Sequence, residues 1–416
     1  MKQDKNISRR DAIKMLGVGT AAVAGMLSGG VAFSQGKRST LKVAMVNSSS
    51  GFYAQYGQEL LRGVELAVEA VNAKGLKIGD TAYDLSLDLF DDKSDASTAA
   101  RLVERADARG ANIVIAGTGS TIGKSIIPIA QRSRIPVIAT WAQLDSIYEA
   151  QKGDPYFFSA MPPFSGYYDS TWAQVAKLDS PKVRKVVMVS PNDELGNLVN
   201  KDLQKKLADN GLELAHVEFF PPSNQDFGAT IERCARHEPD AFLINCYTPQ
   251  ILALFKQMQA VGFFPPVIIV EAPTRLVEAI GEPIDGVYVP TVWFPELDAT
   301  KDQYIGTSAD FARRYQDKHK TLPPDFVAAC GANNVILYAL AAAGLKSPDD
   351  KQGLLSALRS FDGETFFSAV KFDDKGLNTK APIFTGQFQS GKLMLVAPDS
   401  VRQKAPLHPY PGWKQS

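Results

Sequence analysis

The segment at residues 117–125 has the composition of an anion-binding turn. It reads Gly-Thr-Gly-Ser-Thr-Ile-Gly-Lys-Ser. A Walker A loop needs glycine where Thr118 stands, and a dinucleotide-binding fingerprint needs glycine where Ile122 stands, so neither phosphate motif is satisfied. The segment follows a predicted strand and opens a predicted helix, so backbone N–H groups at a helix N-terminus face a crevice. This arrangement suits an anion such as a carboxylate; a purely structural glycine turn is the alternative.

The other reactive side chains form no catalytic or metal-binding pattern. The histidines show no metal-ligand spacing and no His-Glu-x-x-His pair; they are His216, His237, His319 and His408. The sequence also lacks the Gly-x-Ser-x-Gly elbow of serine hydrolases. Asp91 and Asp92 end a predicted strand, but a solvated turn or a helix cap explains them better than catalysis. We therefore predict a protein that is not an enzyme, with no catalytic residue, metal or cofactor; an exported α/β enzyme is the alternative.

The elements that must position these groups alternate between strands and helices. In a first series, strands are predicted near 41–46, 84–90, 112–116 and 135–139, and helices near 58–72, 95–109 and 122–132. After Pro162 and Pro163, a second series has strands near 185–190, 213–219, 240–245 and 267–270, and helices near 165–178, 194–209, 226–236 and 249–261. The strand at 113–116 lacks alternation, which is typical of a parallel sheet covered on both faces. The fold class is therefore α/β, with two doubly wound parallel-sheet lobes.

The last third of the chain has a different pattern. Helices are predicted near 304–319, 326–343 and 349–360, and short strands near 367–372, 382–388 and 392–396. A proline-rich tail follows from Pro398 and is expected to pack irregularly.

The N-terminus has the layout of a twin-arginine export signal. Arg9 and Arg10 precede an uncharged, Ala- and Gly-rich stretch, and Ala32 and Ser34 offer a cleavage site before Gln35. A membrane anchor is the alternative, but the stretch is only weakly apolar. We assign residues 1–34 to a signal peptide and exclude them from the fold.

The composition limits which classes of partner are expected and which states the cysteines can take. With 45 basic and 45 acidic residues the formal net charge is zero, and no basic stripe is interleaved with aromatics, so nucleic acid is not expected as a partner. Export places the cysteines in an oxidising compartment, where one disulfide is possible. The spacing of Cys234, Cys246 and Cys330 fits no metal motif, and free, buried thiols are our preferred interpretation.

Short motifs in a fixed order resemble the periplasmic binding proteins for leucine, isoleucine and valine. They include Ser50-Gly51, Ala54-Gln55-Tyr56-Gly57, Asn72-Ala73-Lys74-Gly75, Asp91-Asp92, Gly119-Ser120-Thr121, Pro136-Val137-Ile138 and Phe372-Asp373-Asp374-Lys375-Gly376. The resemblance spans about residues 41–396. It implies the type I periplasmic binding protein fold, in which two lobes joined by three crossings close on a ligand like a hinge. It also implies a periplasmic location and an ATP-binding-cassette (ABC) permease in the inner membrane as partner.

The resemblance also implies ligand-binding residues on the first lobe. Tyr56 is similar to the aromatic residue that covers the ligand side chain, and Ser120, followed by Thr121, to the serine that holds the ligand carboxylate. Trp141 stands where the family offers a backbone carbonyl to the ligand ammonium. Gln143 stands where the family usually has Thr or Ser.

On the second lobe the resemblance implies two more residues. Tyr247 is similar to the tyrosine that lines the cleft, and Glu271 to the acid that pairs with the ligand ammonium. Ser120, Gln143 and Glu271 each follow the carboxyl end of a predicted strand, which is where open α/β sheets bind ligands. A zwitterion needs donors for its carboxylate and an acid for its ammonium, and Ser120 and Glu271 provide both. A helix cap at Glu271 and a core position for Tyr56 are the alternatives.

Two differences from the family pattern leave the identity of the ligand undetermined. Gln143 replaces the usual Thr beside the bulky Trp141, and Leu195-Gly196 stands where relatives commonly have Tyr-Gly. We expect a monomer that binds an amino acid or related small carboxylate; an aromatic carboxylate, amide or urea-like solute, or a sensor role at a receptor, are alternatives. The expected lobe 1 comprises 41–160 and 291–378, lobe 2 comprises 161–290 and 379–400, and 401–416 form a tail. The hinge is expected near 159–162, 289–291 and 378–381.

Overall fold

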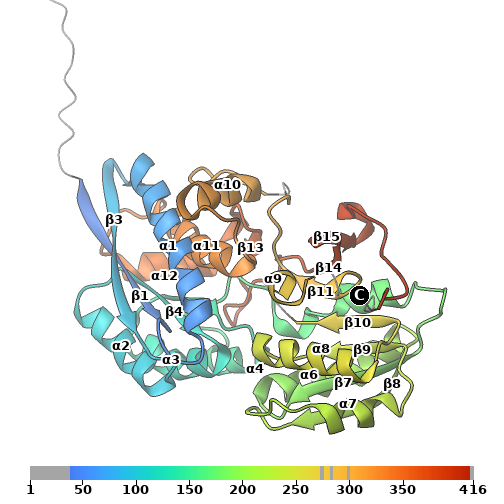
Figure 1. The fold of residues 1–416 in the computed structure, drawn as a ribbon. Coiled ribbons are helices and arrows are strands. Elements are labelled where there is room, and N and C mark those ends of the chain that lie inside the picture. The colour runs from blue at the N-terminus through green and yellow to red at the C-terminus, as the bar shows by residue number, and fades with distance from the viewer. Residues whose placement is uncertain (1–37, 272–275, 282–283, 298–299, 413–416) are drawn as a thin grey trace, which may run out of the picture. The chain divides into compact units, whose positions relative to one another are not determined.

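The computed structural model describes residues 38–271, 276–281, 284–297 and 300–412. The predicted signal peptide at 1–34 lies outside these residues. Most strands belong to two sheets, each with helices packed on it (Figure 1). We call the parts built on the first and second sheets lobe 1 and lobe 2. The predicted α/β class with two mainly parallel sheets is confirmed.

The sheet of lobe 1 has the strand order β2-β3-β1-β4-β5-β6. Its strands are β1 (Ser39–Asn47), β2 (Leu76–Ile78), β3 (Thr81–Asp91), β4 (Ile113–Thr118), β5 (Val137–Trp141) and β6 (Phe157–Phe158). All pairs are parallel except β2 with β3. The connecting helices are α1 (Ala54–Lys74), α2 (Ala96–Ala108) and α3 (Ser120–Ser133). Every residue of β4 is buried, as its run of apolar residues without alternation predicts.

The sheet of lobe 2 has the order β15-β14-β11-β10-β9-β7-β8. Its strands are β7 (Lys185–Pro191), β8 (Glu213–Phe220), β9 (Ala241–Ile244), β10 (Val267–Val270), β11 (Tyr288–Thr291), β14 (Phe384–Gln389) and β15 (Lys392–Ala397). Its helices are α5 (Asp169–Val175), α6 (Glu194–Asp209), α7 (Gly228–Ala235), α8 (Thr248–Val261) and α9 (Leu276–Ile280). The two C-terminal strands pair antiparallel, and β14 joins the sheet at β11. The end of the chain therefore completes the second lobe.

Three helices of the last third return to lobe 1. They are α10 (Ser308–His319), α11 (Phe326–Ala342) and α12 (Lys351–Arg359). Helix α11 crosses α1 at two glycines: a Cβ at Gly63 would lie 1.7 Å from the carbonyl oxygen of Ala328, and one at Gly331 would lie 2.3 Å from that of Leu60. Asn334 donates to the carbonyl of Ala139 in β5 (2.9 Å). Helix α11 is thereby fixed against both α1 and the sheet.

Two of the predicted hinge segments, 159–162 and 378–381, lie next to each other. Ser159 bridges Leu377, and the Asn378 side chain donates to the carbonyl of Ala160 at 2.9 Å. The remaining predicted segment, 289–291, lies within β11 and ends with it at Thr291. The lobe boundaries and the hinge motion themselves stay predictions.

Several local predictions were wrong. The predicted helix at 165–178 is a 3₁₀ turn (Phe164–Gly166) followed by the short α5, because Tyr167 and Tyr168 turn inward to pack in the core. Helix α10 begins at residue 308, four residues late, because Thr307 and Asp310 form a capping box there. The strand at 367–372 is the three-residue β13 (Ala369–Lys371), paired with an unpredicted β12 (Asp362–Glu364). Other unpredicted elements are β2, β6, α4 (Asp145–Tyr148), α9 and β11.

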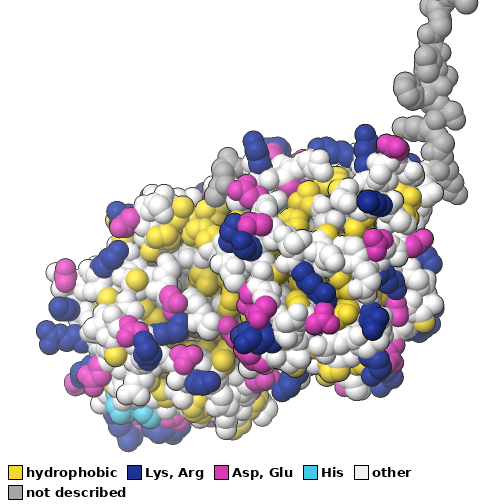
Figure 2. Space-filling model, turned by 180° about the vertical axis from the view of Figure 1, so that it is seen from behind, with side chains coloured by type: hydrophobic (Ala, Val, Ile, Leu, Met, Phe, Trp, Pro, Cys, Tyr) yellow, Lys and Arg dark blue, Asp and Glu magenta, His cyan; other side chains and the backbone are white. Residues whose placement is uncertain are grey.

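The three cysteines are free and buried, which confirms the preferred interpretation. Burial raises the pKa of Cys234 and of Cys330 to about 12. Among the described residues, no helix is long and apolar enough to cross a membrane, and no three His, Cys, Asp or Glu side chains group as metal ligands. On the face drawn in Figure 2, basic and acidic side chains are interspersed.

Candidate functional site

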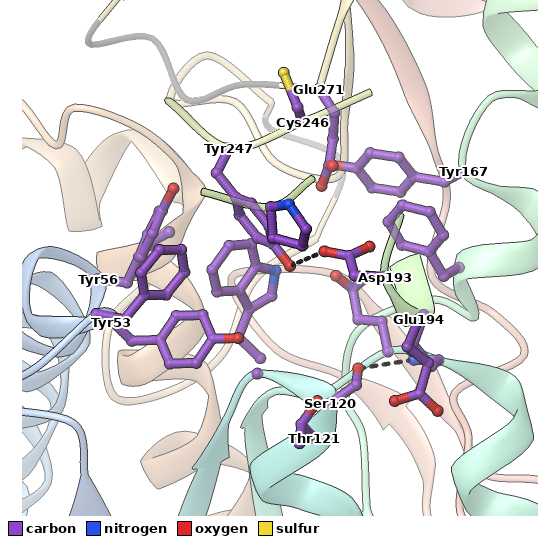
Figure 3. A pocket seen from close by; sticks show the side chains of 18 of the residues that line it. Tyr53, Tyr56, Ser120, Thr121, Tyr167, Asp193, Glu194, Cys246, Tyr247 and Glu271 are labelled. Carbon is purple, nitrogen blue, oxygen red and sulfur yellow. Dashed lines mark hydrogen bonds between the residues drawn. The ribbon is translucent and has the colours of Figure 1, made fainter. Parts of the chain in front are cut away.

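A cavity of about 270 Å³ is lined by residues from both lobes. It lies at the carboxyl ends of parallel strands, where open α/β sheets bind their ligands. The structure brings all seven predicted site residues to this one cavity; they are Tyr56, Ser120, Thr121, Trp141, Gln143, Tyr247 and Glu271. Figure 3 shows the side chains that surround it. Their contact with a ligand stays a prediction.

The N-terminus of α3 opens onto this cavity. Gly119 caps the helix with φ of +95°, and a Cβ there would lie 3.0 Å from the ring of Tyr53, so glycine is required on both counts. The Gly119 N–H donates to the carbonyl of Trp141 (3.0 Å), and the Ser120 hydroxyl accepts from the N–H of Leu144 (3.3 Å). Free N–H groups of a first helical turn and a hydroxyl at its start form an anion site. The predicted anion-binding turn therefore has the required geometry.

Gln143 has a structural role in the first crossing between the lobes. Its side chain is only 5% exposed and donates to the carbonyl of Pro162 (3.1 Å), while its backbone carbonyl accepts from Phe164 (3.0 Å). The bulkier amide in place of the usual Thr thus ties β5 to the chain that leaves lobe 1. The glutamine that departs from the family pattern therefore has hydrogen-bond partners within the protein itself.

Aromatic rings form much of the cavity wall and touch across it. Tyr56 and Trp141 on lobe 1 pack with ring centroids 4.6 Å apart. The Tyr56 hydroxyl lies 3.3 Å from the hydroxyl of Thr248 on lobe 2. Phe52 meets Tyr247 edge to face at 5.4 Å. Burial raises the pKa of Tyr56 to about 12, so this tyrosine is a neutral hydrogen-bonding group.

The wall of lobe 2 contributes the carboxylates of Glu271 and Asp193, with the exposed Glu194 at its rim. Glu271 directly follows β10, and desolvation, with a smaller effect from Asp193, raises its pKa to about 8. Asp193 caps α6, accepting from the N–H of Gly196 at 3.0 Å and from the Tyr247 hydroxyl at 3.5 Å. Tyr247 is the N-cap residue of α8. Three neighbouring strand ends thus place one phenol and two acids on one side of the cavity (Figure 3).

Sequence reasoning missed four conspicuous members of the site. Phe52, Tyr53, Tyr167 and Asp193 also line the cavity. Asp193 follows β7 as Glu271 follows β10, so the strand-end rule applied to every predicted strand would have found it. Tyr167 was hidden because it fell inside a predicted helix.

Asp91 and Asp92, by contrast, do not line this cavity. Asp91 accepts from the Ser50 hydroxyl and Asp92 from the Ser48 hydroxyl, each at 2.7 Å. Both carboxylates therefore stabilise the loop after β1, but Asp92 is buried there and not solvated, as a solvated turn would require.

Comparison with known proteins agrees with this architecture. The profile of the periplasmic binding protein family matches residues 40–392. The chain belongs to this family. It is 25% identical to Leu/Ile/Val-binding protein homolog 7 of Brucella suis biovar 1 (strain 1330) over 402 residues, covering 91% of this chain and 96% of that protein. It is 24% identical to homolog 8 of Brucella abortus (strain 2308) over 377 residues, covering 84% and 89%.

Solved structures share the type I fold. The isoleucine complex of LivJ, the branched-chain amino acid transporter substrate-binding protein of Streptococcus pneumoniae, superimposes with a TM-score of 0.72 at 20% identity, covering 86% of this chain and all of that one. A solute-binding protein of an ABC transporter from R. palustris, in complex with benzoate, also gives 0.72 at 19% identity, covering 88% and 99%. The fold predicted from the resemblance is confirmed.

Proposed function

We propose that this chain is the solute-binding component of an ABC importer and captures an amino acid or related small carboxylate in the cavity between its lobes. The observation that carries the proposal is the pairing of the α3 N-terminus and Ser120 on lobe 1 with Glu271 on lobe 2 across one cavity. The Leu/Ile/Val-binding names of the Brucella relatives and the isoleucine complex of LivJ support the same ligand class.

The mechanism follows from the position of these groups. The ligand carboxylate accepts hydrogen bonds from the first turn of α3 and from Ser120, with Thr121 at the exposed rim. The ammonium lies at Glu271, and its positive charge favours the ionised form of a carboxyl whose pKa burial has raised. The aromatic wall covers the apolar side chain. Because these contacts come from both lobes, the ligand favours the closed arrangement and is sealed from water.

An aromatic carboxylate, or a related amide, is the second candidate. It is favoured by the rings of Tyr56, Trp141 and Tyr247 around a cavity of about 270 Å³, and by the benzoate complex of the R. palustris protein. A flat aromatic ligand can stack on these rings.

The proposed function also includes an export route and a membrane partner. The chain crosses the inner membrane by the twin-arginine route, acts in the periplasm as a monomer and releases its ligand unchanged to an ABC permease. Replacing Arg9 and Arg10 together by lysine should leave the full-length precursor in the cytoplasm. Cell fractionation measures this, and mature protein in the periplasm of the double variant would refute the twin-arginine route.

Thermal-shift measurements on the mature protein test the ligand class. The protein is unfolded and refolded to remove bound solutes, then heated with amino acids, aromatic acids, amides and polyols. Binding to the folded state raises the melting temperature by mass action. We expect an amino acid or small carboxylate to give the largest rise, and titration calorimetry to show binding of one equivalent without turnover. A rise with polyols alone would refute the proposed ligand class.

A further inference from the structure

Exposure identifies the mouth of the cavity. Of the described residues that line the cavity, most are buried or half-buried and four are exposed. The exposed ones are Phe52 and Thr121 on lobe 1 and Glu194 and Pro222 on lobe 2. These four residues therefore form the rim at which the cavity meets solvent, with two residues from each lobe.

A ring contact crosses this mouth at Phe52. The Phe52 ring, which precedes α1 and is 65% exposed, meets the ring of Tyr247 edge to face with centroids 5.4 Å apart. A second contact lies along the same two segments, where the hydroxyls of Tyr56 and Thr248 are 3.3 Å apart. The start of α1 on lobe 1 therefore touches the start of α8 on lobe 2.

An ion pair crosses the mouth at Glu194. Glu194 is the first residue of α6, and its carboxylate lies 4.0 Å from the ammonium nitrogen of Lys124 on α3. Both side chains are in water, so solvent weakens their attraction, and such a pair shifts an equilibrium by at most about 5-fold. The start of α3 on lobe 1 is thereby linked to the start of α6 on lobe 2.

We propose that the Phe52–Tyr247 and Lys124–Glu194 contacts form a latch across the mouth, which slows the release of the ligand without slowing its entry. This inference rests on the proposed solute-binding function and adds a control on the release step of the same site. The latch consists of protein groups alone, so it acts on every ligand that the cavity accepts.

The effect on release follows from the position of the two contacts. Each contact joins residues of different lobes, so it exists only while the lobes are together. A ligand leaves when the lobes part, and both contacts must break for that to happen. A ligand enters before the lobes come together, when neither contact has formed. The latch therefore lowers the dissociation rate constant and leaves the association rate constant almost unchanged.

The two contacts differ in their response to salt. An edge-to-face ring pair depends little on ionic strength, because it involves no net charge. The attraction of an exposed ion pair is screened, since the Debye length falls from about 30 Å at 0.01 M salt to about 3 Å at 1 M. Ligand release should therefore become about 2- to 3-fold faster at high salt, and the ring contact accounts for the slowing that remains.

Stopped-flow fluorescence of the refolded mature protein measures both rate constants, with Trp141 in the cavity wall as the source of the signal. The probes are a smaller and a larger amino acid, leucine and phenylalanine, and a smaller and a larger acid, benzoate and 3-phenylpropanoate. We expect Phe52→Ala to release a bound probe about 3- to 10-fold faster, with an association rate constant within about 2-fold of the unaltered value. Pro222→Ala, which removes an apolar side chain but no ring at the same rim, is the control and should change neither rate constant by more than about 2-fold.

Probe size separates a latch from direct contact with the ligand. A contact between protein groups slows the smaller and the larger probe of a pair by the same factor. An effect of Phe52→Ala that grows with the size of the probe would show that Phe52 holds the ligand itself, and would overturn the ring contact as part of the latch. A loss confined to the association rate constant would overturn it too.

A double-mutant cycle tests the ion pair. Lys124→Gln, Glu194→Gln and the double variant are compared with the unaltered protein, and any direct effect of Glu194 on the ligand cancels in the cycle. At low salt we expect either single change to speed release by about 2- to 3-fold and the second change to add nothing. At high salt this coupling should disappear. Additive effects of the two changes, or a coupling that salt does not reduce, would overturn the ion pair as part of the latch.

The outcomes distinguish this inference from the proposed function. All the substituted residues are exposed, and an unchanged melting temperature without ligand shows that the variants are folded. If a probe binds but leaves every variant at the unaltered rate, the chain remains a solute-binding protein and only the latch falls. If no probe binds the unaltered protein, both fall.

Discussion

Replacing Glu271 by glutamine should stabilise the ligand-free protein, and increasingly so as the pH rises. The pKa of Glu271 is about 8 in the folded protein, against 4.5 for an ordinary glutamate, because the carboxyl is desolvated and lies near Asp193. Below pH 4.5 both folded and unfolded chains hold the proton, so the residue has no effect on stability. Between pH 4.5 and 8 the unfolded chain loses the proton while the folded chain keeps it, so this carboxyl lowers stability as pH rises.

The size of the effect follows from the same two pKa values. At about 1.4 kcal/mol for each pKa unit, an ionised Glu271 costs the folded state at most about 5 kcal/mol above pH 8. The cavity of about 270 Å³ has room for water, which relieves part of this cost. We therefore expect the stability advantage of Glu271→Gln over the unaltered protein to grow by about 2 kcal/mol between pH 5 and pH 8, and to level off above pH 8.

Urea unfolding of both proteins, stripped of ligand, measures this difference at half-unit steps of pH. Other titrating groups are common to the two proteins and cancel in the comparison. Glu194→Gln, which removes an exposed carboxylate at the rim of the same cavity, is the matched control and should show no such trend. A Glu271→Gln advantage that is constant with pH, or that shrinks as pH rises, would refute the account of Glu271 as a buried acid awaiting a cation.

Three further substitutions test the packing and the two sides of the cavity. Gly63→Ala should destabilise the protein by about 3 kcal/mol in urea unfolding, because the new Cβ would lie 1.7 Å from the Ala328 carbonyl oxygen. Gly344→Ala is the control: its Cβ meets no close neighbour, so it should change stability by less than about 1 kcal/mol. Equal effects of the two substitutions would contradict the close crossing of α1 and α11. Tyr56→Phe removes the hydrogen bond between lobe 1 and α8 and should weaken ligand binding by about 3- to 10-fold in calorimetry; unchanged affinity would mean that this contact adds nothing to closure. Ser120→Ala should weaken binding of a carboxylate-bearing ligand about 10-fold and leave an amine with the same apolar group unaffected; a loss shared by both would instead indicate a disturbed cavity.

Most of the fold could be predicted from local pattern. The helix at residues 194–209 was predicted with the same bounds, because Asp193 caps it and its apolar spacing is regular. The apolar run 113–116 of β4 was recognised as a buried parallel strand because it lacks alternation. Strands that form only by pairing with distant segments were not predicted. The two-residue β6 forms only against β5, and β11 pairs with β14, almost a hundred residues further along the chain.

Site residues that follow predicted strands could likewise be predicted, whereas those placed by tertiary packing could not. Ser120, Gln143 and Glu271 follow predicted strands, so topology alone gathers them at the sheet edges. The pocket position of Tyr167 depends on how a non-helical segment folds inward after the first crossing, which no periodicity encodes. The elevated pKa of Glu271 likewise depends on enclosure by both lobes, and a sequence gives no measure of that desolvation.

The burial of all three thiols makes the protein suited to conversion into an optical reporter. Cys234, Cys246 and Cys330 are at most 1% exposed, and burial suppresses the reactive thiolate in each of them. A single cysteine introduced in place of Phe52, which is 65% exposed beside the Tyr247 ring, would then be the one thiol that a maleimide dye reaches quickly. If the lobes close on the ligand as proposed, a dye sensitive to polarity at that position would brighten or dim, and so give a direct readout of solute concentration.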